Sequence, residues 1–241
     1  MMKTYIWYFL LLSFSFLYAQ SKHIIAIDPG HSKHRFGARA SSGATEYTYN
    51  IKIAKILSYI LKENHTLDTF IINPSGEKIK LKTRTDIANE NNASLFISLH
   101  HDSVKMKYLT KYKKKPFITY STNAFSGYSI FISKKNTHFV ESLSLAKSIG
   151  YQLQLSGFHY SKHHSEKIKG ENHILLDKKV GVYLFDNLVV LKKTQIPAVL
   201  IECGIIVNPE EENKIKNTDY HQRFSMAIKK GVELYLKNPI H

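Results

Sequence analysis

Short, almost continuous apolar runs alternate along the chain with longer segments in which apolar residues recur at a helical period. Such runs, each closed by a turn or a polar residue, are typical of strands buried on both faces of a parallel sheet. They occupy residues 23–28, 67–72, 94–100, 128–133 and 197–202. The helical periods predict helices over 46–63, 84–92 and 138–155 and helical structure within 209–236. We therefore expect one α/β domain with a twisted, mostly parallel central sheet flanked by helices.

The first 20 residues differ from this pattern. Lys3 precedes an apolar run over about residues 5–17, and small Ala19 follows it. The run is shorter than the ~20 residues that a membrane-spanning helix needs, and a small residue near its end suits signal peptidase. We predict a signal peptide over 1–20 and one catalytic domain over 21–241. An exported protein of the periplasm, cell envelope or extracellular space follows, without stable membrane insertion after cleavage. An uncleaved anchor is the alternative.

Two segments between the predicted strands and helices are longer than ordinary connections. Residues 104–127 hold many lysines with interleaved tyrosines, and residues 158–177 hold four histidines among lysines and serines. Ordered loops of this length are often functional, and either could border a binding cleft.

The amino-acid composition limits the class of protein and the kinds of metal site that are possible. The 241 residues include 34 Lys and Arg against 19 Asp and Glu, a formal net charge of +15, and 43% are hydrophobic. This composition excludes a disordered or low-complexity chain. The one cysteine, Cys203, excludes a disulfide framework and any cysteine-rich zinc or iron–sulfur site. A bound metal would therefore need histidine and carboxylate ligands, and the positive charge indicates a polyanionic partner or an anionic surface.

Polar residues follow three of the predicted strands. His31 comes just after the first strand, His100 closes the third, and Glu202 closes the last, while Glu46 begins the first long helix. In open α/β sheets, ligands bind at the carboxyl ends of parallel strands, so these side chains can converge. Two histidines and a carboxylate can hold a catalytic zinc, and a further carboxylate can move a proton. The spacing alone supports two interpretations about equally. One is a zinc hydrolase, and the other is that four unrelated residues happen to lie at strand and helix ends.

Two further pairs match the His-x-x-Glu spacing of zinc carboxypeptidases, His138 with Glu141 and His163 with Glu166. Residues three apart share one face of a helix, so each pair could hold a metal. We interpret the first pair as the solvated start of a helix and the second as loop surface. Cys203 follows Glu202 directly, should face the opposite side of its strand, and is expected to be buried and inert.

Six short motifs follow one another at these strand ends and helix starts. They are Ile27-Asp-Pro-Gly-His31, Thr45-Glu46, Ile87-Ala-Asn89, Phe96-Ile-Ser-Leu-His-His-Asp-Ser103, Pro197-Ala-Val-Leu-Ile-Glu-Cys-Gly204 and Asn208-Pro-Glu-Glu211. In this order they resemble the zinc-dependent N-acetylmuramoyl-L-alanine amidases (amidase type 3), which are bacterial cell-wall hydrolases with an α/β fold. The resemblance extends from about residue 24 to residue 237.

The resemblance implies hydrolysis of the amide bond between N-acetylmuramic acid and the L-alanine of the peptidoglycan stem peptide. It implies one zinc ion per chain, with His31, Glu46 and His100 as its ligands and Glu202 as the catalytic carboxylate. Other possibilities are a zinc carboxypeptidase-type peptidoglycan peptidase and a cell-wall binding protein without catalysis, although a binding protein would normally have lost one of these four residues.

The sequence departs from the family's pattern in two places. Ser32-Lys-His34 replaces a glycine-rich stretch after the first histidine, and Ile205 stands where the family typically has phenylalanine. Neither departure touches an implied ligand.

Substrate contacts are assigned to two other residues. His101 should point to the side of its strand opposite His100 and is expected to support the site or to contact substrate. Arg84 could bind a carboxylate of the stem peptide, with a plain surface arginine as the alternative. Asp28 could support His31 or simply form the turn.

The expected partner is peptidoglycan. The lysines and tyrosines of residues 105–115 look like a nucleic-acid patch, but export argues against nucleic acid as a partner. Anionic wall polymers or lipid headgroups fit the positive charge better. A regulatory protein partner cannot be identified from the sequence.

Overall fold

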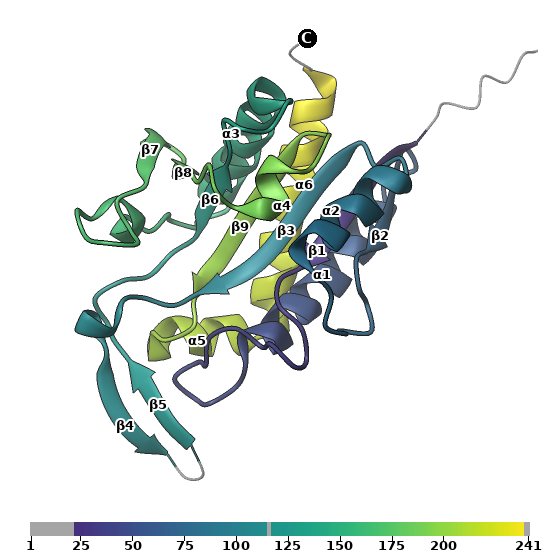
Figure 1. The fold of residues 1–241 in the computed structure, drawn as a ribbon. Helices are drawn as coiled ribbons and strands as arrows, with labels where there is room; N and C mark the ends of the chain where they lie inside the picture. The colour runs from purple at the N-terminus through teal and green to yellow at the C-terminus, as the bar shows by residue number, and fades with distance from the viewer. Residues whose placement is uncertain (1–21, 115–116, 239–241) are drawn as a thin grey trace, which may run out of the picture.

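A seven-stranded sheet lies at the centre of the computed structural model, which describes residues 22–114 and 117–238 (Figure 1). The predicted signal peptide lies outside the described residues. Across the sheet the order is β2-β1-β3-β9-β6-β8-β7. The strands are β1 (His23–Pro29), β2 (Leu67–Ile71), β3 (Leu95–Asp102), β6 (Ser129–Ile132), β7 (Ile174–Asp177), β8 (Val182–Leu184) and β9 (Ala198–Ile205).

Most neighbouring strands are parallel. The pairs β1–β2, β1–β3, β3–β9 and β6–β8 run parallel, whereas β6–β9 and β7–β8 are antiparallel. This confirms the predicted mostly parallel sheet. It also brings the carboxyl ends of β1, β3 and β9 to the same edge.

Helices cover both faces of the sheet (Figure 1). On one face α1 (Glu46–Lys62), α6 (Thr218–Lys237) and α3 (Phe139–Leu155) lie side by side, and on the other α2 (Leu81–Glu90) contacts α4 (Val189–Lys192). The core is divided in the same way, because Ile25 and Ile27 of β1 pack with the first helix group and Ala26 packs in a second cluster. Burial on both faces explains why the strands read as continuous apolar runs. The short helix α5 (Pro209–Lys216) precedes α6.

Two central strands are longer than predicted. Beyond His100 and Glu202, β3 and β9 continue pairing, and Asp102 lies opposite Ile205 after a register shift. The polar residues at the predicted strand ends therefore lie within the sheet's last pairs. Helix α2 begins at Leu81, three residues before the predicted start at Arg84. The residues just before Arg84 carry no apolar repeat that would have marked this earlier start.

The lysine-rich connection 104–127 is partly regular. It contains the short 3₁₀ turn η1 (Met106–Tyr108) and an antiparallel hairpin of β4 (Thr110–Lys114) and β5 (Phe117–Ser121), with Thr110 opposite Ser121. The hairpin projects away from the central sheet (Figure 1). The other long connection, 158–177, contains the 3₁₀ turn η2 (His163–Ser165) and β7. Within 22–114 and 117–238, no helix combines the length and the hydropathy needed to cross a membrane.

Candidate active site

Three of the predicted residues meet at the edge formed by β1 and β3. Glu46, the first residue of α1, lies between two imidazoles: its Oε2 is 3.0 Å from His31 Nε2 and its Oε1 is 3.0 Å from His100 Nδ1. One nitrogen or oxygen atom from each residue lies within 4.8 Å of the others, a spacing that one metal ion can bridge. The convergence expected at the carboxyl ends of the strands is therefore present.

Glu46 is held as a carboxylate. It is buried, and burial raises its pKa, but hydrogen bonds with His100 and His31 and their positive charges together hold the pKa well below its usual range. Asn50, one turn further along α1, donates from Nδ2 to Glu46 Oε1 over 3.2 Å and to the Gly30 carbonyl oxygen over 3.1 Å. The backbone N–H of Ala38 donates to Glu46 Oε2 over 3.0 Å. An ionised carboxylate at a helix N-terminus is also favoured by the helix dipole.

Arg84 of α2 holds the loop that carries His31 in place through contacts with its backbone. The Arg84 Nη1 lies 2.5 Å from Asp28 Oδ1 and donates to the Pro29 carbonyl over 2.9 Å, while Nη2 donates to the His31 carbonyl. Arg84 is 3% exposed, so the expectation of a surface arginine is wrong. Its guanidinium lies inside the protein and not on an open binding surface. Asp28, which also accepts a hydrogen bond from Ser98 Oγ at 2.8 Å, supports the loop through Arg84.

Two glycines allow the ligand side chains to approach closely. A Cβ at Gly30 would lie 2.1 Å from His100 Nε2, and a Cβ at Gly37 would lie 2.2 Å from Glu46 Oε2. Gly37 also has φ of +75°, and His31 has φ of 68°, both in the left-handed region. The backbone therefore turns sharply enough to bring His31 back towards Glu46.

His101 supports the site from the interior. It is buried, and its Nδ1 lies 2.8 Å from Asn50 Oδ1, so it orients the amide that contacts Glu46. Burial, together with the nearby charge of His221, lowers the pKa of His101 to about 3 and keeps it neutral. These contacts place the ring among side chains of α1 and α6.

Glu202 lies beside His100 across the β3–β9 pairing, where the two residues are in register. Its Oε2 is buried and has no hydrogen-bond partner among the described residues. Burial and the negative charges of Asp102, Glu46 and Glu171 raise its pKa well above the usual range. Cys203, the next residue, is buried, and burial raises the pKa of its thiol, as expected for an inert cysteine.

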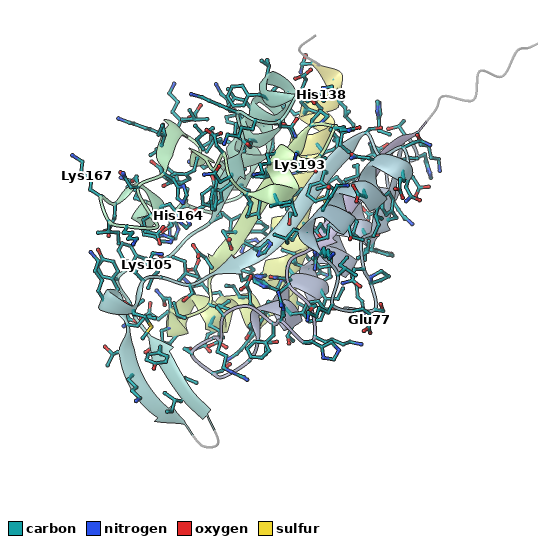
Figure 2. All side chains as sticks on the ribbon, in the orientation of Figure 1. Glu77, Lys105, His138, His164, Lys167 and Lys193 are labelled. Atoms are coloured by element: carbon teal, nitrogen blue, oxygen red, sulfur yellow. The ribbon has the colours of Figure 1, made fainter. Side chains whose placement is uncertain are left out.

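The two His-x-x-Glu pairs differ in burial and in the contacts that their histidines make. His138 Nδ1 lies 3.3 Å from Glu141 Oε1 at the start of α3, where both are partly exposed, as predicted. His163 and its neighbour His164 are buried, so the interpretation as loop surface is wrong. The partner of His163 is Asp102 and not Glu166, which instead accepts a hydrogen bond from Tyr108. Figure 2 shows His164 and Lys105 close together and His138 far from both. The sequence carried no signal for this group, because Asp102 is distant along the chain.

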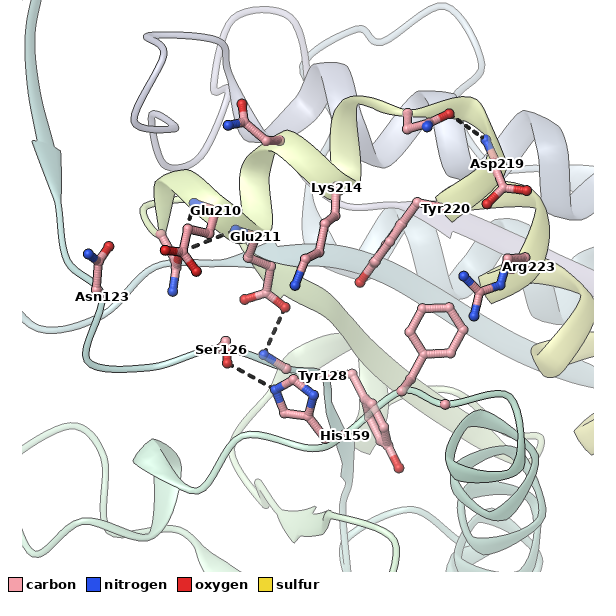
Figure 3. A pocket seen from close by; sticks show the side chains of 16 residues that line it. Asn123, Ser126, Tyr128, His159, Glu210, Glu211, Lys214, Asp219, Tyr220 and Arg223 are labelled. Atoms are coloured by element: carbon pink, nitrogen blue, oxygen red, sulfur yellow. Dashed lines mark hydrogen bonds between the residues drawn. The ribbon is translucent and has the colours of Figure 1, made fainter.

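A pocket of about 830 Å³ lies elsewhere, between α5, α6 and the segments around residues 126 and 158 (Figure 3). There the Glu211 carboxylate accepts a hydrogen bond from the Gly127 N–H, and Ser126 contacts His159. None of the predicted site residues lines this pocket. The candidate site is therefore the edge of the sheet and not this hollow.

The chain resembles known amidases over most of its length. The family model described as N-acetylmuramoyl-L-alanine amidase (Amidase_3) matches residues 25–234. The N-acetylmuramoyl-L-alanine amidase AmiA of Salmonella typhimurium is 28% identical over 228 residues, which cover 89% of this chain and 76% of that protein. A protein of Staphylococcus aureus described as a probable cell wall amidase, LytH, is 26% identical over 88% of this chain and 57% of its own.

Solved structures resemble the fold over about 90% of the chain. An N-acetylmuramoyl-L-alanine amidase from Clostridium difficile 630 has 25% identity and a TM-score of 0.70, covering 91% of this chain and 100% of that one. The amidase Ami1 of Mycobacterium smegmatis, at 18% identity and a TM-score of 0.71, covers 90% and 98% and shares the fold. With the family model matching nearly all of the described residues, the chain belongs to the N-acetylmuramoyl-L-alanine amidases, a family of zinc-dependent hydrolases that act on peptidoglycan.

Proposed function

We propose that this amidase binds one catalytic zinc ion through His31, Glu46 and His100 and that Glu202 is its catalytic carboxylate. The observation that carries the proposal is the position of Glu46 between the two imidazoles, with Glu202 in register beside His100. The bond to be cleaved is the amide between the lactyl group of N-acetylmuramic acid and L-alanine.

The residues present fit zinc. Two imidazole nitrogens and one carboxylate form a ligand set known for catalytic zinc, which keeps a further position open. The carboxylate is ionised, and Gly30 and Gly37 leave the space that the three side chains occupy. When bound, zinc supplies a Lewis acid that polarises the scissile carbonyl and acidifies a water molecule.

Glu202 is suited to move the proton. Its Oε2 is buried and has no partner among the described residues, so it can hold a proton between two steps. Glu202 takes a proton from the attacking water as the oxygen–carbon bond forms at the carbonyl. It then donates that proton to the L-alanine nitrogen as the carbon–nitrogen bond breaks.

Arg84 and His101 are proposed to position ligands rather than to contact substrate. Arg84 fixes the loop that presents His31, and His101 fixes Asn50 and thereby Glu46. Each acts through another residue, so replacing either should weaken zinc binding as well as lower the rate.

Export is part of the proposal. The apolar run over 5–17 followed by Ala19 supports a signal peptide over 1–20 and work in the cell envelope. N-terminal sequencing of the protein recovered from the envelope fraction tests this: a mature chain beginning near residue 21 is expected, and retention of Met1 would overturn the cleavage.

The direct test of the site is Glu202→Gln, which keeps the shape of the side chain and removes the base. We expect hydrolysis of purified sacculi to fall by about 10² to 10⁴, the usual contribution of general acid–base catalysis, with zinc content unchanged. Glu210→Gln, an exposed carboxyl on α5, is the matched control and should keep the full rate. Wild-type activity in Glu202→Gln would overturn the proposal.

A further inference from the structure

A second group of histidine and carboxylate side chains lies at the end of β3, apart from His31, Glu46 and His100. Asp102 Oδ2 is 2.9 Å from His163 Nε2 and 2.8 Å from His164 Nε2, and all three side chains are largely buried. His163 and His164 form η2, within the long connection between α3 and β7. Nothing in the roles assigned above uses these three residues.

The three atoms converge without forming hydrogen bonds. Although the distances are short, Asp102 Oδ2, His163 Nε2 and His164 Nε2 have no aligned hydrogen-bond partner among the described residues. Hydrogen bonds need the N–H to point along the line to the acceptor, and contacts that fail this are weak. These three buried polar atoms lie within 4.8 Å of one another, a spacing that one ion can bridge.

The other nitrogen of each ring is already engaged. His164 Nδ1 lies 2.8 Å from Glu171 Oε2, and His163 Nδ1 lies 2.8 Å from Ser161 Oγ. When Nδ1–H donates to such a partner, the lone pair is on Nε2 and the ring is oriented, the usual arrangement behind a metal-binding histidine. With Nδ1 engaged in this way, each ring presents its Nε2 to Asp102.

The two imidazole rings of this group lie against each other beside one carboxylate. The two rings are only 3.8 Å apart between centroids, so two charged imidazoliums would repel each other across a buried contact. A divalent cation placed between the three side chains would give Asp102 Oδ2 and both Nε2 atoms a partner.

We propose that Asp102, His163 and His164 bind a second divalent metal ion of the zinc class. Two imidazoles and a carboxylate suit zinc or a similar first-row ion. With metal–ligand distances of about 2.0 to 2.2 Å in tetrahedral geometry, ligand atoms around one ion lie about 3.3 to 3.6 Å apart, so the three atoms need to separate by about half an ångström to hold the ion. His164 also belongs to a group with Glu171 and His173, but the bond from Nδ1 to Glu171 leaves Nε2 for the Asp102 side.

Such an ion would tie the connection between α3 and β7 to the end of β3. Asp102 is two residues from His100, and its charge reaches Glu202. The second ion would therefore fix the chain at the border of the catalytic edge.

Zinc content tests the proposal independently of the catalytic zinc. The double variant His31→Asn/His100→Asn removes the first set of ligands. We expect two zinc ions per chain in the wild type, one in the double variant and none when His163→Asn is added. His138→Asn in the same background is the matched control and should keep one ion. Absence of zinc in the double variant, or zinc retained after His163→Asn, would overturn the second site.

Circular dichroism shows whether each variant is folded. If a variant does not fold, cadmium NMR of the wild-type protein tests the second site without any substitution. In ¹¹³Cd NMR of wild-type protein loaded with cadmium, the proposal predicts two signals of equal intensity. A single signal at saturating cadmium would overturn it. Loss of catalysis without loss of the second signal would separate a failure of the catalytic assignment from a failure of this one.

Discussion

Arg84 of α2 and Asp28 of β1 form a buried ion pair, with 2.5 Å between Nη1 and Oδ1, directly beneath the loop that carries His31. The same guanidinium reaches the carbonyls of Pro29 and His31. A charged pair in the core thus connects the second helix to the candidate zinc site.

Arg84→Met should destabilise the protein and weaken zinc binding together. Removing one partner of a buried pair leaves an uncompensated charge on Asp28, which costs about 3 to 5 kcal/mol. Urea denaturation with the metal removed measures the stability change, and titration measures zinc affinity. Lys82→Met is the control, because Lys82 pairs with Asp86 on the exposed face of the same helix and such pairs contribute about 0 to 1 kcal/mol. Equal losses in the two variants would contradict the role given to Arg84.

Gly30→Ala should displace His100. The added Cβ would lie 2.1 Å from His100 Nε2, so the imidazole must move. Because a displacement of about 1 Å can cost about 100-fold in rate, we expect at least that loss in sacculus hydrolysis. Gly157→Ala is the control: its φ of +85° makes a side chain unfavourable, but the nearest atom to its Cβ is 3.9 Å away. It should lower stability by about 1 kcal/mol and leave the rate unchanged. A fully active Gly30→Ala would show that His100 is not confined as described.

Acid should destabilise the protein through His221 of α6. Burial and the charge of Lys52 lower its pKa to about 4, and His101 and Tyr220 face its ring. Between pH 6.5 and 4 the unfolded chain binds a proton at this residue that the folded chain does not. Stability therefore falls as the pH falls through this window, by about 3 kcal/mol from His221.

Urea midpoints measured from pH 7 to pH 4 in chelator report this loss without interference from zinc release. His221→Leu should flatten the pH dependence, leaving the part due to His101, which shifts in the same direction. His65→Gln replaces an exposed histidine and should leave the slope unaltered. An unchanged slope in His221→Leu would rule out this source of acid sensitivity.

The sheet and the meeting of the candidate site residues at one edge could be predicted because both depend on local pattern. Apolar runs such as 197–202 are long and uninterrupted, and a histidine or glutamate at the end of one is easily recognised. Parallel strands then bring His31, His100 and Glu202 to one edge without any knowledge of loops.

The remaining features depend on contacts between distant residues. Arg84 lies in a short polar helix whose sequence gives no sign that its guanidinium is buried, because its partner Asp28 is on another element. In the sequence, His163 and His164 belong to a basic loop, and only their contact with the distant Asp102 shows that they form a group. The β4–β5 hairpin lacks the alternating apolar residues that mark a half-buried strand, because it projects from the core.

The central claim is that zinc held by His31, Glu46 and His100, with Glu202, cleaves the amide between muramic acid and L-alanine. Mass spectrometry of sacculus digests, with and without chelator, tests it most directly. We predict stem peptides that begin with a free L-alanine amino group, their disappearance after chelation, and their return on adding zinc to the wild type but not to Glu202→Gln. Cleavage at another bond, or undiminished release of these peptides in chelator, would contradict the account.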